Sequence, residues 1–225
     1  MVLASAGCLR DNAWICGEYV RTRQDDILAA LDEHVTLTLE SVLIAIVVAF
    51  PLALLARRSR WLKPLVLGSS TIVYTIPSLA LFAVLLPVTG LTEKTVVIGL
   101  VLYALTVLIR SFVAGLDGVP EDVRDAARGM GFGPVRMLWK VDLPLAIPTM
   151  FVGIRIAIVS TVALVTIGYV VGYGGLGNLI AQGLSSDFKA QVLTASVLCV
   201  VLAVAGDLIA LFVQWVVTPW RRVRT

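Results

Sequence analysis

The sequence predicts an all-α integral membrane protein with five transmembrane helices. Of the 225 residues, 59% are hydrophobic and 15% are charged, and the mean hydropathy is +0.95. Soluble domains carry roughly 25% charged residues. Five apolar runs of 22 or 27 residues recur along the chain, and each is long enough to cross about 30 Å of hydrocarbon as a helix. One long polar stretch, residues 120–144, interrupts them.

The apolar runs set the expected domain boundaries. They cover residues 35–56, 65–86, 95–116, 145–171 and 191–217. We expect residues 1–34 to form an extracytoplasmic tail, residues 35–217 the transmembrane domain and residues 218–225 a cytoplasmic tail. A short amphipathic helix that leads from the N-terminal tail to the membrane is indicated by Ile27, Leu28 and Leu31.

The uneven distribution of lysine and arginine predicts the orientation. Twelve of the 18 lie in the link 57–63, the stretch 110–140 and the C-terminal tail. The opposite links carry only Lys94 and Lys189, and the N-terminal tail adds three arginines. Because cytoplasmic links carry the excess of positive charge, we expect the N-terminus outside and the C-terminus in the cytoplasm. The polar stretch then faces the cytoplasm.

The polar stretch opens with a predicted helix over residues 121–130. Pro120 suits a helix start, and three acidic residues follow it near the positive end of the helix dipole. An apolar stripe at spacing i, i+3, i+4, i+7 consists of Val123, Ala126, Ala127 and Met130. The helix should end at Gly131, which permits a left-handed cap. Its small side chains favour docking into a groove of another protein; a helix lying on the membrane surface fits the pattern equally.

The spacing of this stretch resembles the EAA loop of ABC importer permeases. The family pattern is E-A-A, three residues, G, nine residues, I-x-L-P. Here Asp125-Ala126-Ala127, Gly131 and Val141-Asp142-Leu143-Pro144 match every spacing, with Asp125 for Glu and Val141 for Ile. The resemblance implies a type I ABC importer permease (MetI-like) fold, in which residues 117–144 are the coupling loop that docks on a cytoplasmic ATPase. The positions it assigns to this coupling are Glu121, Asp122, Asp125, Ala126, Ala127, Met130, Gly131, Leu143 and Pro144.

Two further segments resemble the osmoprotectant subclass of this family. They are Ile76–Leu81 and the glycine-rich run 172–180, which are similar to segments of permeases for glycine betaine, carnitine and choline. The resemblance implies a path for a quaternary amine of the glycine betaine, carnitine, choline or proline betaine type; an amino acid such as methionine is the alternative. It also implies an ATPase dimer that binds ATP and Mg²⁺, a second permease chain, and an extracytoplasmic binding protein. The chain itself is expected to be a non-catalytic subunit without a cofactor, in a bacterial cell membrane.

Charged side chains inside the apolar runs are candidates for the translocation path. Arg155 and Asp207 each cost roughly 2.5 to 3.5 kcal/mol at depth, and counting from the cytoplasmic ends of their helices places both roughly 15 Å into the membrane. We expect either that they pair or that both face a watery path. The alternative is two separate polar groups, each satisfied by backbone or water.

Helix-breaking residues are the other candidates for the path. Pro51 and Pro77 are expected to interrupt the first and second helices, and hydroxyls that precede Pro77 are expected to satisfy backbone groups freed by it. Pro77 and Ser78 then line the path or form a structural kink. The run 172–177 matches G-x-G-x-x-G, but the strand of a βαβ unit does not precede it, so we exclude a dinucleotide site. We expect Gly174, Gly175 and Gly177 to permit close backbone approach, at the external mouth of the path or for packing alone.

Other functions are disfavoured by the composition. A net charge of +3 does not suit nucleic-acid binding. The single histidine, His34, and the three cysteines form no C-x-x-C or Cys/His motif, so a metal site is not expected, and the state of Cys8 and Cys16 stays open. A membrane enzyme would need a nucleophile–base set that the sequence does not offer. A stand-alone secondary transporter shares helix breaks and buried charges, but it does not account for the matched cytoplasmic loop.

Overall fold

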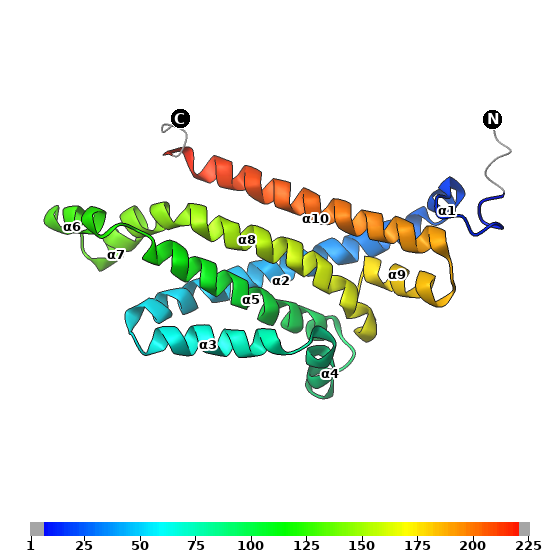
Figure 1. Cartoon of the computed structure of the whole chain (residues 1–225), viewed down its shortest axis with the longest axis horizontal. Helices are drawn as coiled ribbons and strands as arrows, with labels where there is room; N and C mark the ends of the chain where they lie inside the picture. Colours follow the sequence, from blue (N-terminus) through cyan, green and yellow to red (C-terminus); the bar gives the residue numbers. More distant parts are fainter. Residues whose placement is uncertain (1–6, 221–225) are drawn as a thin grey trace. The chain divides into compact units, whose positions relative to one another are not determined.

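The computed structural model describes residues 7–220, and every regular element within them is helical. Figure 1 traces the helices in chain order. They are α1 (Gly17–Thr22), α2 (Gln24–Arg58), α3 (Leu62–Thr75), α4 (Ser78–Thr89), α5 (Glu93–Asp117), α6 (Glu121–Gly129), α7 (Pro134–Met137), the π-helical turn η1 (Leu138–Asp142), α8 (Leu143–Val165), the 3₁₀ turn η2 (Thr166–Val171), α9 (Leu176–Ser185) and α10 (Lys189–Val217).

Four helical stretches of the described residues are long and apolar enough to cross a membrane. They are α2, α5, the continuous stretch 134–171 around α8, and α10. The broken pair α3–α4 passes the same test when it is taken as one span, which gives up to five. The predicted all-α membrane fold with five spans agrees with this, with the second span divided into two helices.

The two prolines of the first two spans, both expected to interrupt their helices, behave differently from each other. Helix α2 continues through Pro51, so the expected interruption there was wrong. The predicted helix 65–86 is divided, since α3 ends at Thr75 and α4 begins at Ser78. Pro77 adopts φ −56° and ψ 138°, which is extended backbone. Because proline also disfavours the helical conformation of the residue before it, the chain leaves the helix at this point, and the expected interruption at Pro77 is confirmed.

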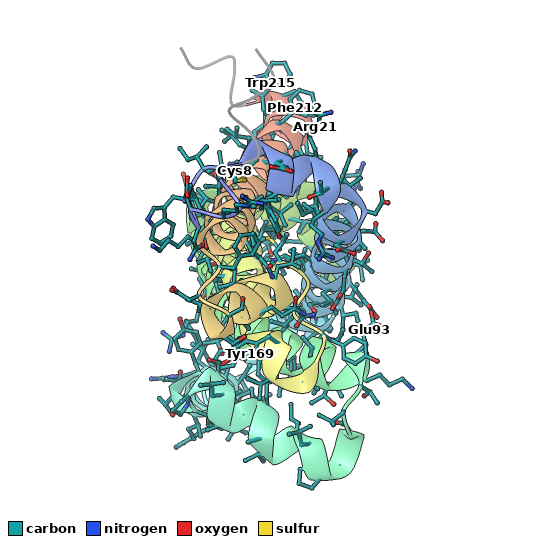
Figure 2. All side chains as sticks on the ribbon, turned by 90° about the vertical axis from the view of Figure 1, so that its right-hand side faces the viewer. Cys8, Arg21, Glu93, Tyr169, Phe212 and Trp215 are labelled. Atoms are coloured by element: carbon teal, nitrogen blue, oxygen red, sulfur yellow. A yellow bond between two sulfur atoms is a disulfide. The ribbon has the colours of Figure 1, made fainter. Side chains whose placement is uncertain are left out.

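The N-terminal segment is more structured than a tail. The amphipathic pattern of Ile27 belongs to the first turns of α2, which begins at Gln24 and runs into the membrane span without a separate helix. Before it, Cys8 and Cys16 form a disulfide with their Cα atoms 5.5 Å apart; Figure 2 labels Cys8. The sequence left the state of these cysteines open, and the structure pairs them.

The chain forms two compact units. Within the described residues, the first comprises 7–42, 76–101 and 159–205, and the second comprises 43–75, 102–158 and 206–220. Each of α2, α5, α8 and α10 contributes residues to both units.

Two apolar clusters lie among the described residues of the first unit. One is a core from α2, α4, α5 and the α8–η2 region, and it consists of Leu37, Phe82, Val96, Val97, Leu100, Val165 and Val171. The other joins the N-terminal segment to α9 and α10, where the rings of Tyr19 and Phe188 meet edge to face at 5.1 Å. Asn12 strengthens this second cluster by donating to the carbonyl of Asp187 and accepting from the amide of Lys189 at 3.0 Å.

The second unit buries small residues of α2 and large residues of α5. Four fully buried alanines recur at helical spacing on α2, namely Ala45, Ala49, Ala53 and Ala56. Leu108, Phe112 and Leu116 form the buried face of α5. Small residues let membrane helices approach closely. On α10, Phe212 and Trp215 stack at 6.1 Å with 62% and 55% of their surface exposed (Figure 2), as expected for a face that meets lipid or another chain.

Candidate functional site

The predicted coupling helix is present as α6 and is delimited by the residues that the sequence indicated. Pro120 is its N-cap, and Glu121 and Asp122 occupy its first turn. The helix ends at Gly129, one residue before the predicted Met130, which is its C-cap. Gly131 follows with φ +80°, a conformation that glycine adopts without strain. The amide of Phe132 then donates to the carbonyl of Ala127 at 3.1 Å, which satisfies one of the free carbonyls of the last turn.

The apolar stripe of α6 is divided between the interior and the surface. Ala127 is only 2% exposed and contacts its own chain, whereas Val123 is 38% and Met130 68% exposed. Ala126 is also exposed. Beyond α6, Val135 and Trp139 add 70% and 56% exposed apolar side chains to the same loop. The expectation that the whole stripe enters a partner was therefore wrong for Ala127, and the remaining positions form an exposed surface.

Acidic and basic side chains on α6 pair with one another. Arg128 contacts Glu121 at 2.8 Å and Asp125 at 2.6 Å. Hydrogen bonds from Arg124, and then from Arg128, hold the pKa of Glu121 below its ordinary value. For Arg124, burial by itself would lower the pKa, but the hydrogen bonds to Asp142 and Glu121 outweigh it and raise the pKa above the ordinary value. Both groups are therefore charged across the physiological range.

The conformation at the end of the coupling loop is explained by the local sequence. Pro144 lies in the first turn of α8 and has no N–H to donate to the carbonyl four residues earlier. The preceding residues form the π-helical turn η1, in which the amide of Leu143 reaches the carbonyl of Leu138. Wide turns of this kind often occur at functional positions in helices. Leu143 and Pro144 thus place a widened turn at the junction between the loop and the span.

Arg155 and Asp207 pair within the second unit. The Nε and Nη2 atoms of Arg155 donate to Oδ1 and Oδ2 of Asp207, both at 2.7 Å. Of the alternatives that the sequence left open, the structure shows the pairing, and the bidentate geometry explains how α8 and α10 carry these charges in apolar sequence. The side chains keep 32% and 29% of their surface exposed. Their place in a translocation path stays a prediction.

The hydroxyls before Pro77 have other partners than expected. Ser69 donates to the carbonyl of Val66 at 3.1 Å, and Thr71 donates to that of Leu67 at 2.7 Å. Thr75 donates to the carbonyl of Ile72 at 2.7 Å. The carbonyl four residues before Pro77 belongs to Val73, so these bonds do not serve it. The expectation was wrong because serine and threonine in helices bond preferentially to carbonyls three or four residues earlier on their own helix.

The glycine run 172–177 permits close packing in the first unit. Gly175 has φ +52°, and a Cβ atom on it would lie 2.7 Å from Cβ of His34. A Cβ atom on Gly177 would overlap the backbone of Thr166. The amide of Gly175 donates to Oε1 of Glu33 at 3.2 Å. The expected close backbone approach is therefore present; the role of these glycines at the mouth of a path stays a prediction.

The family comparison agrees with this arrangement of spans and loop. Residues 41–223 match the model of the binding-protein-dependent transport system inner membrane component family. This chain belongs to that family.

Similar inner membrane components come from several bacteria. The osmoprotectant import permease protein OsmW of Salmonella typhimurium is 36% identical over 193 residues, which is 83% of this chain and 89% of that protein. The glycine betaine/carnitine/choline transport system permease protein OpuCD of Bacillus subtilis is 31% identical over 207 residues, or 92% and 90% of the two chains. By the description of its family, the chain is a membrane-embedded, non-catalytic component of a binding-protein-dependent transporter.

A solved structure has the same fold. A chain in the inward-facing MetNI methionine ABC transporter superimposes with a TM-score of 0.80, covering 88% of this chain and 98% of that one at 23% identity. At this identity the likeness establishes the fold alone.

Sequence reasoning missed part of the charged network around the coupling loop. The side chains of Arg57, Asp117, Arg124 and Asp142 connect this loop to the rest of the second unit. The only sequence signal was Asp142 itself, an acidic residue between Val141 and Leu143 at the entrance of an apolar run.

Proposed function

We propose that this chain forms, with a second permease chain, the membrane path of an ATP-driven importer for a quaternary-amine osmoprotectant. The observation that carries the proposal is its similarity, over most of its length, to permeases named for osmoprotectants and for glycine betaine, carnitine and choline. The substrates in question share a permanently charged ammonium group without N–H donors. Such a cation is recognised by aromatic faces, and we assign this recognition to a separate extracytoplasmic binding protein.

The partner on the cytoplasmic side is an ATPase dimer, which binds ATP and Mg²⁺. The exposed surface of α6 supports this assignment, because Val123, Ala126 and Met130 offer apolar contact area. Acidic side chains at the start of the helix flank them. A short helix with small side chains can enter a groove closely, and the exposed coupling positions lie on α6 or next to it, namely Glu121, Asp122, Asp125, Ala126, Met130 and Gly131.

Two independent features support an orientation with the N-terminus outside. The excess of lysine and arginine falls on the links that this orientation places in the cytoplasm. The disulfide between Cys8 and Cys16 lies in the N-terminal segment, and disulfides persist outside the cytoplasm. The coupling loop then faces the ATPase, and the glycine run 172–177 faces the binding protein.

Transport proceeds by alternating access. ATP closes the ATPase dimer, and α6 moves with the ATPase subunit on which it docks. The two permease chains tilt and open the path toward the binding protein, and hydrolysis resets them. Within this cycle the Arg155–Asp207 pair holds α8 to α10. Pro77 and Ser78 allow the second span to bend, and Gly174, Gly175 and Gly177 keep the outer loop compact.

Uptake of labelled glycine betaine, carnitine and choline tests the proposal. The measurement compares cells that lack other importers for these compounds, with and without the gene for this chain, at low and high salt. We expect deletion to abolish uptake of at least one compound and a plasmid copy to restore it. Unchanged uptake of all three would contradict the substrate class, and loss of methionine uptake in the same cells would favour the amino-acid alternative.

A further inference from the structure

A buried carboxylate lies where the coupling loop joins its membrane span. Asp142 is the last residue of η1, directly before α8, and only 10% of its side chain is exposed. The stretch 117–144 carries many charges, and most of the charged side chains on α6 are more than half exposed. Asp142 differs from them because its carboxylate faces other parts of the second unit.

Each oxygen of Asp142 binds a different arginine. Oδ1 accepts from Nε of Arg124, on α6, at 2.8 Å, and Oδ2 accepts from Nη1 of Arg57, at the end of α2, at 3.4 Å. The arginines are 12% and 21% exposed. We call these three residues the Asp142 junction. It connects α6, the start of α8 and the end of α2 through side chains alone.

Both arginines are fixed by further contacts. Arg124 donates to the carbonyl of Leu116 at 2.6 Å and to Glu121 at 3.2 Å. The Nε atom of Arg57 donates to Asp117 at 3.1 Å, and Lys63 donates to the other oxygen of Asp117 at 2.7 Å. Each arginine therefore has at least one partner besides Asp142, so a displacement of either arginine pulls on the shared carboxylate.

The backbone segments on either side of α6 restrain this helix less than the Asp142 junction does. Three residues, 118–120, link α5 to α6, and a short segment with two glycines, Gly131 and Gly133, links α6 to α7. Glycines leave the backbone free to rotate. Without the junction, α6 is restrained by these links and by the burial of Ala127, and not by an ion pair to α2 or to the start of α8. With it, rotation of α6 must break hydrogen bonds between charged groups.

Stability alone is a poor explanation for this arrangement. Buried ion pairs pay a desolvation cost that often cancels their attraction, whereas they do fix one geometry among alternatives. Two arginines on one carboxylate, from two different helices, fix the relative rotation of those helices.

We propose that Asp142 is a positioning residue that transmits the movement of α6 to α2 and α8 during the transport cycle. The inference rests on the proposed function, because it assumes that an ATPase moves α6. Loss of the carboxylate then leaves α6 able to dock, and the ATPase able to hydrolyse ATP, while less of the movement reaches the spans.

The test compares uptake with ATP consumption in the reconstituted complex. The intact chain and its Asp142→Asn variant are purified with the ATPase subunits and placed in liposomes with the binding protein and labelled glycine betaine. Coupling networks typically change by factors of about two to thirty when one member is lost. We expect uptake per ATP hydrolysed to fall within that range, while co-purification of the ATPase and its hydrolysis rate change little.

Three further variants and a matched control separate transmission from a general structural role. Asp142→Glu should recover part of the ratio of uptake to ATP hydrolysed, because it restores the charge. Arg124→Gln should lower the ratio, and the double variant with Asp142→Asn should lose no more than the worse single variant, since both interrupt one connection. Asp26→Asn is the matched control, because its pair with Arg23 is 58% and 65% exposed; it should leave the ratio unchanged.

Several outcomes would overturn the inference. An unchanged ratio in assembled Asp142→Asn complex contradicts transmission, and loss of ATPase binding would show that Asp142 serves docking instead. If neither Asp142→Asn nor Asp142→Glu assembles, the role is structural. An intact complex that hydrolyses ATP but takes up none of glycine betaine, carnitine and choline refutes the proposed substrate class, and one without a bound ATPase refutes the proposed function, so each failure is recognisable.

Discussion

Two aspartates of the second unit are held by arginine in different ways. Asp207 gives both oxygens to one guanidinium, Arg155, at 2.7 Å each. Asp142 divides its oxygens between Arg57 and Arg124, which come from different helices. The first arrangement is a closed pair that joins two spans. The second is a junction in which a change at one helix reaches another, so similar chemistry serves attachment in one place and transmission in the other.

The largest effect is expected from breaking the closed pair. Arg155→Ala or Asp207→Ala leaves one charge without its partner in an apolar helix, which is costly in a membrane. We expect a several-fold loss of folded protein in the membrane for each single variant. The double variant, Arg155→Leu with Asp207→Leu, should recover most of the loss because no charge is then unpaired. The measurement is the amount of monodisperse protein extracted in mild detergent. Single variants that accumulate as well as the intact chain would show that the pair does not hold the spans together.

The smallest effect is expected from the exposed part of the network on α6. Hydrogen bonds from Arg124 and Arg128 lower the pKa of Glu121 from 4.5. A carboxylate whose pKa is lowered by folding stabilises the fold above its unfolded value, and this contribution is lost as the pH falls through the folded value. Melting temperature should therefore decline below about pH 4.5 slightly more steeply for the intact chain than for Glu121→Gln. Identical slopes would mean that these bonds add nothing to stability.

The sequence predicts one of the two arrangements and not the other, for a physical reason. Arg155 and Asp207 are conspicuous because a charge in an apolar run is rare, and the regular rise of a helix places both at one depth. Asp142 lies among many charged residues that are each expected to face water. Which of them becomes buried depends on how α2 and α6 pack against the loop, and no local pattern encodes that.

The helices show the same difference between features set by local sequence and features set by packing. The bounds of α6 follow from Pro120, the acidic first turn and Gly131, which act within a few residues. The effects of Pro51 and Pro77 could not be separated by such local rules. A proline costs a helix a hydrogen bond in either place, and the packing of the flanking turns decides whether the helix continues. Pairing of Cys8 with Cys16 likewise depends on the path of the backbone between them.

Docking of α6 on the ATPase is the claim on which the account depends, and co-purification tests it most directly. Ala126 is exposed on α6, so Ala126→Trp adds bulk to the docking surface without entering the protein interior. Trp61→Ala is the control, since Trp61 is 86% exposed outside this loop. We predict that the intact chain and the control retain the ATPase, while Ala126→Trp loses it at an unchanged melting temperature. Equal retention of the ATPase by Ala126→Trp, or its absence from the intact chain, would contradict the account.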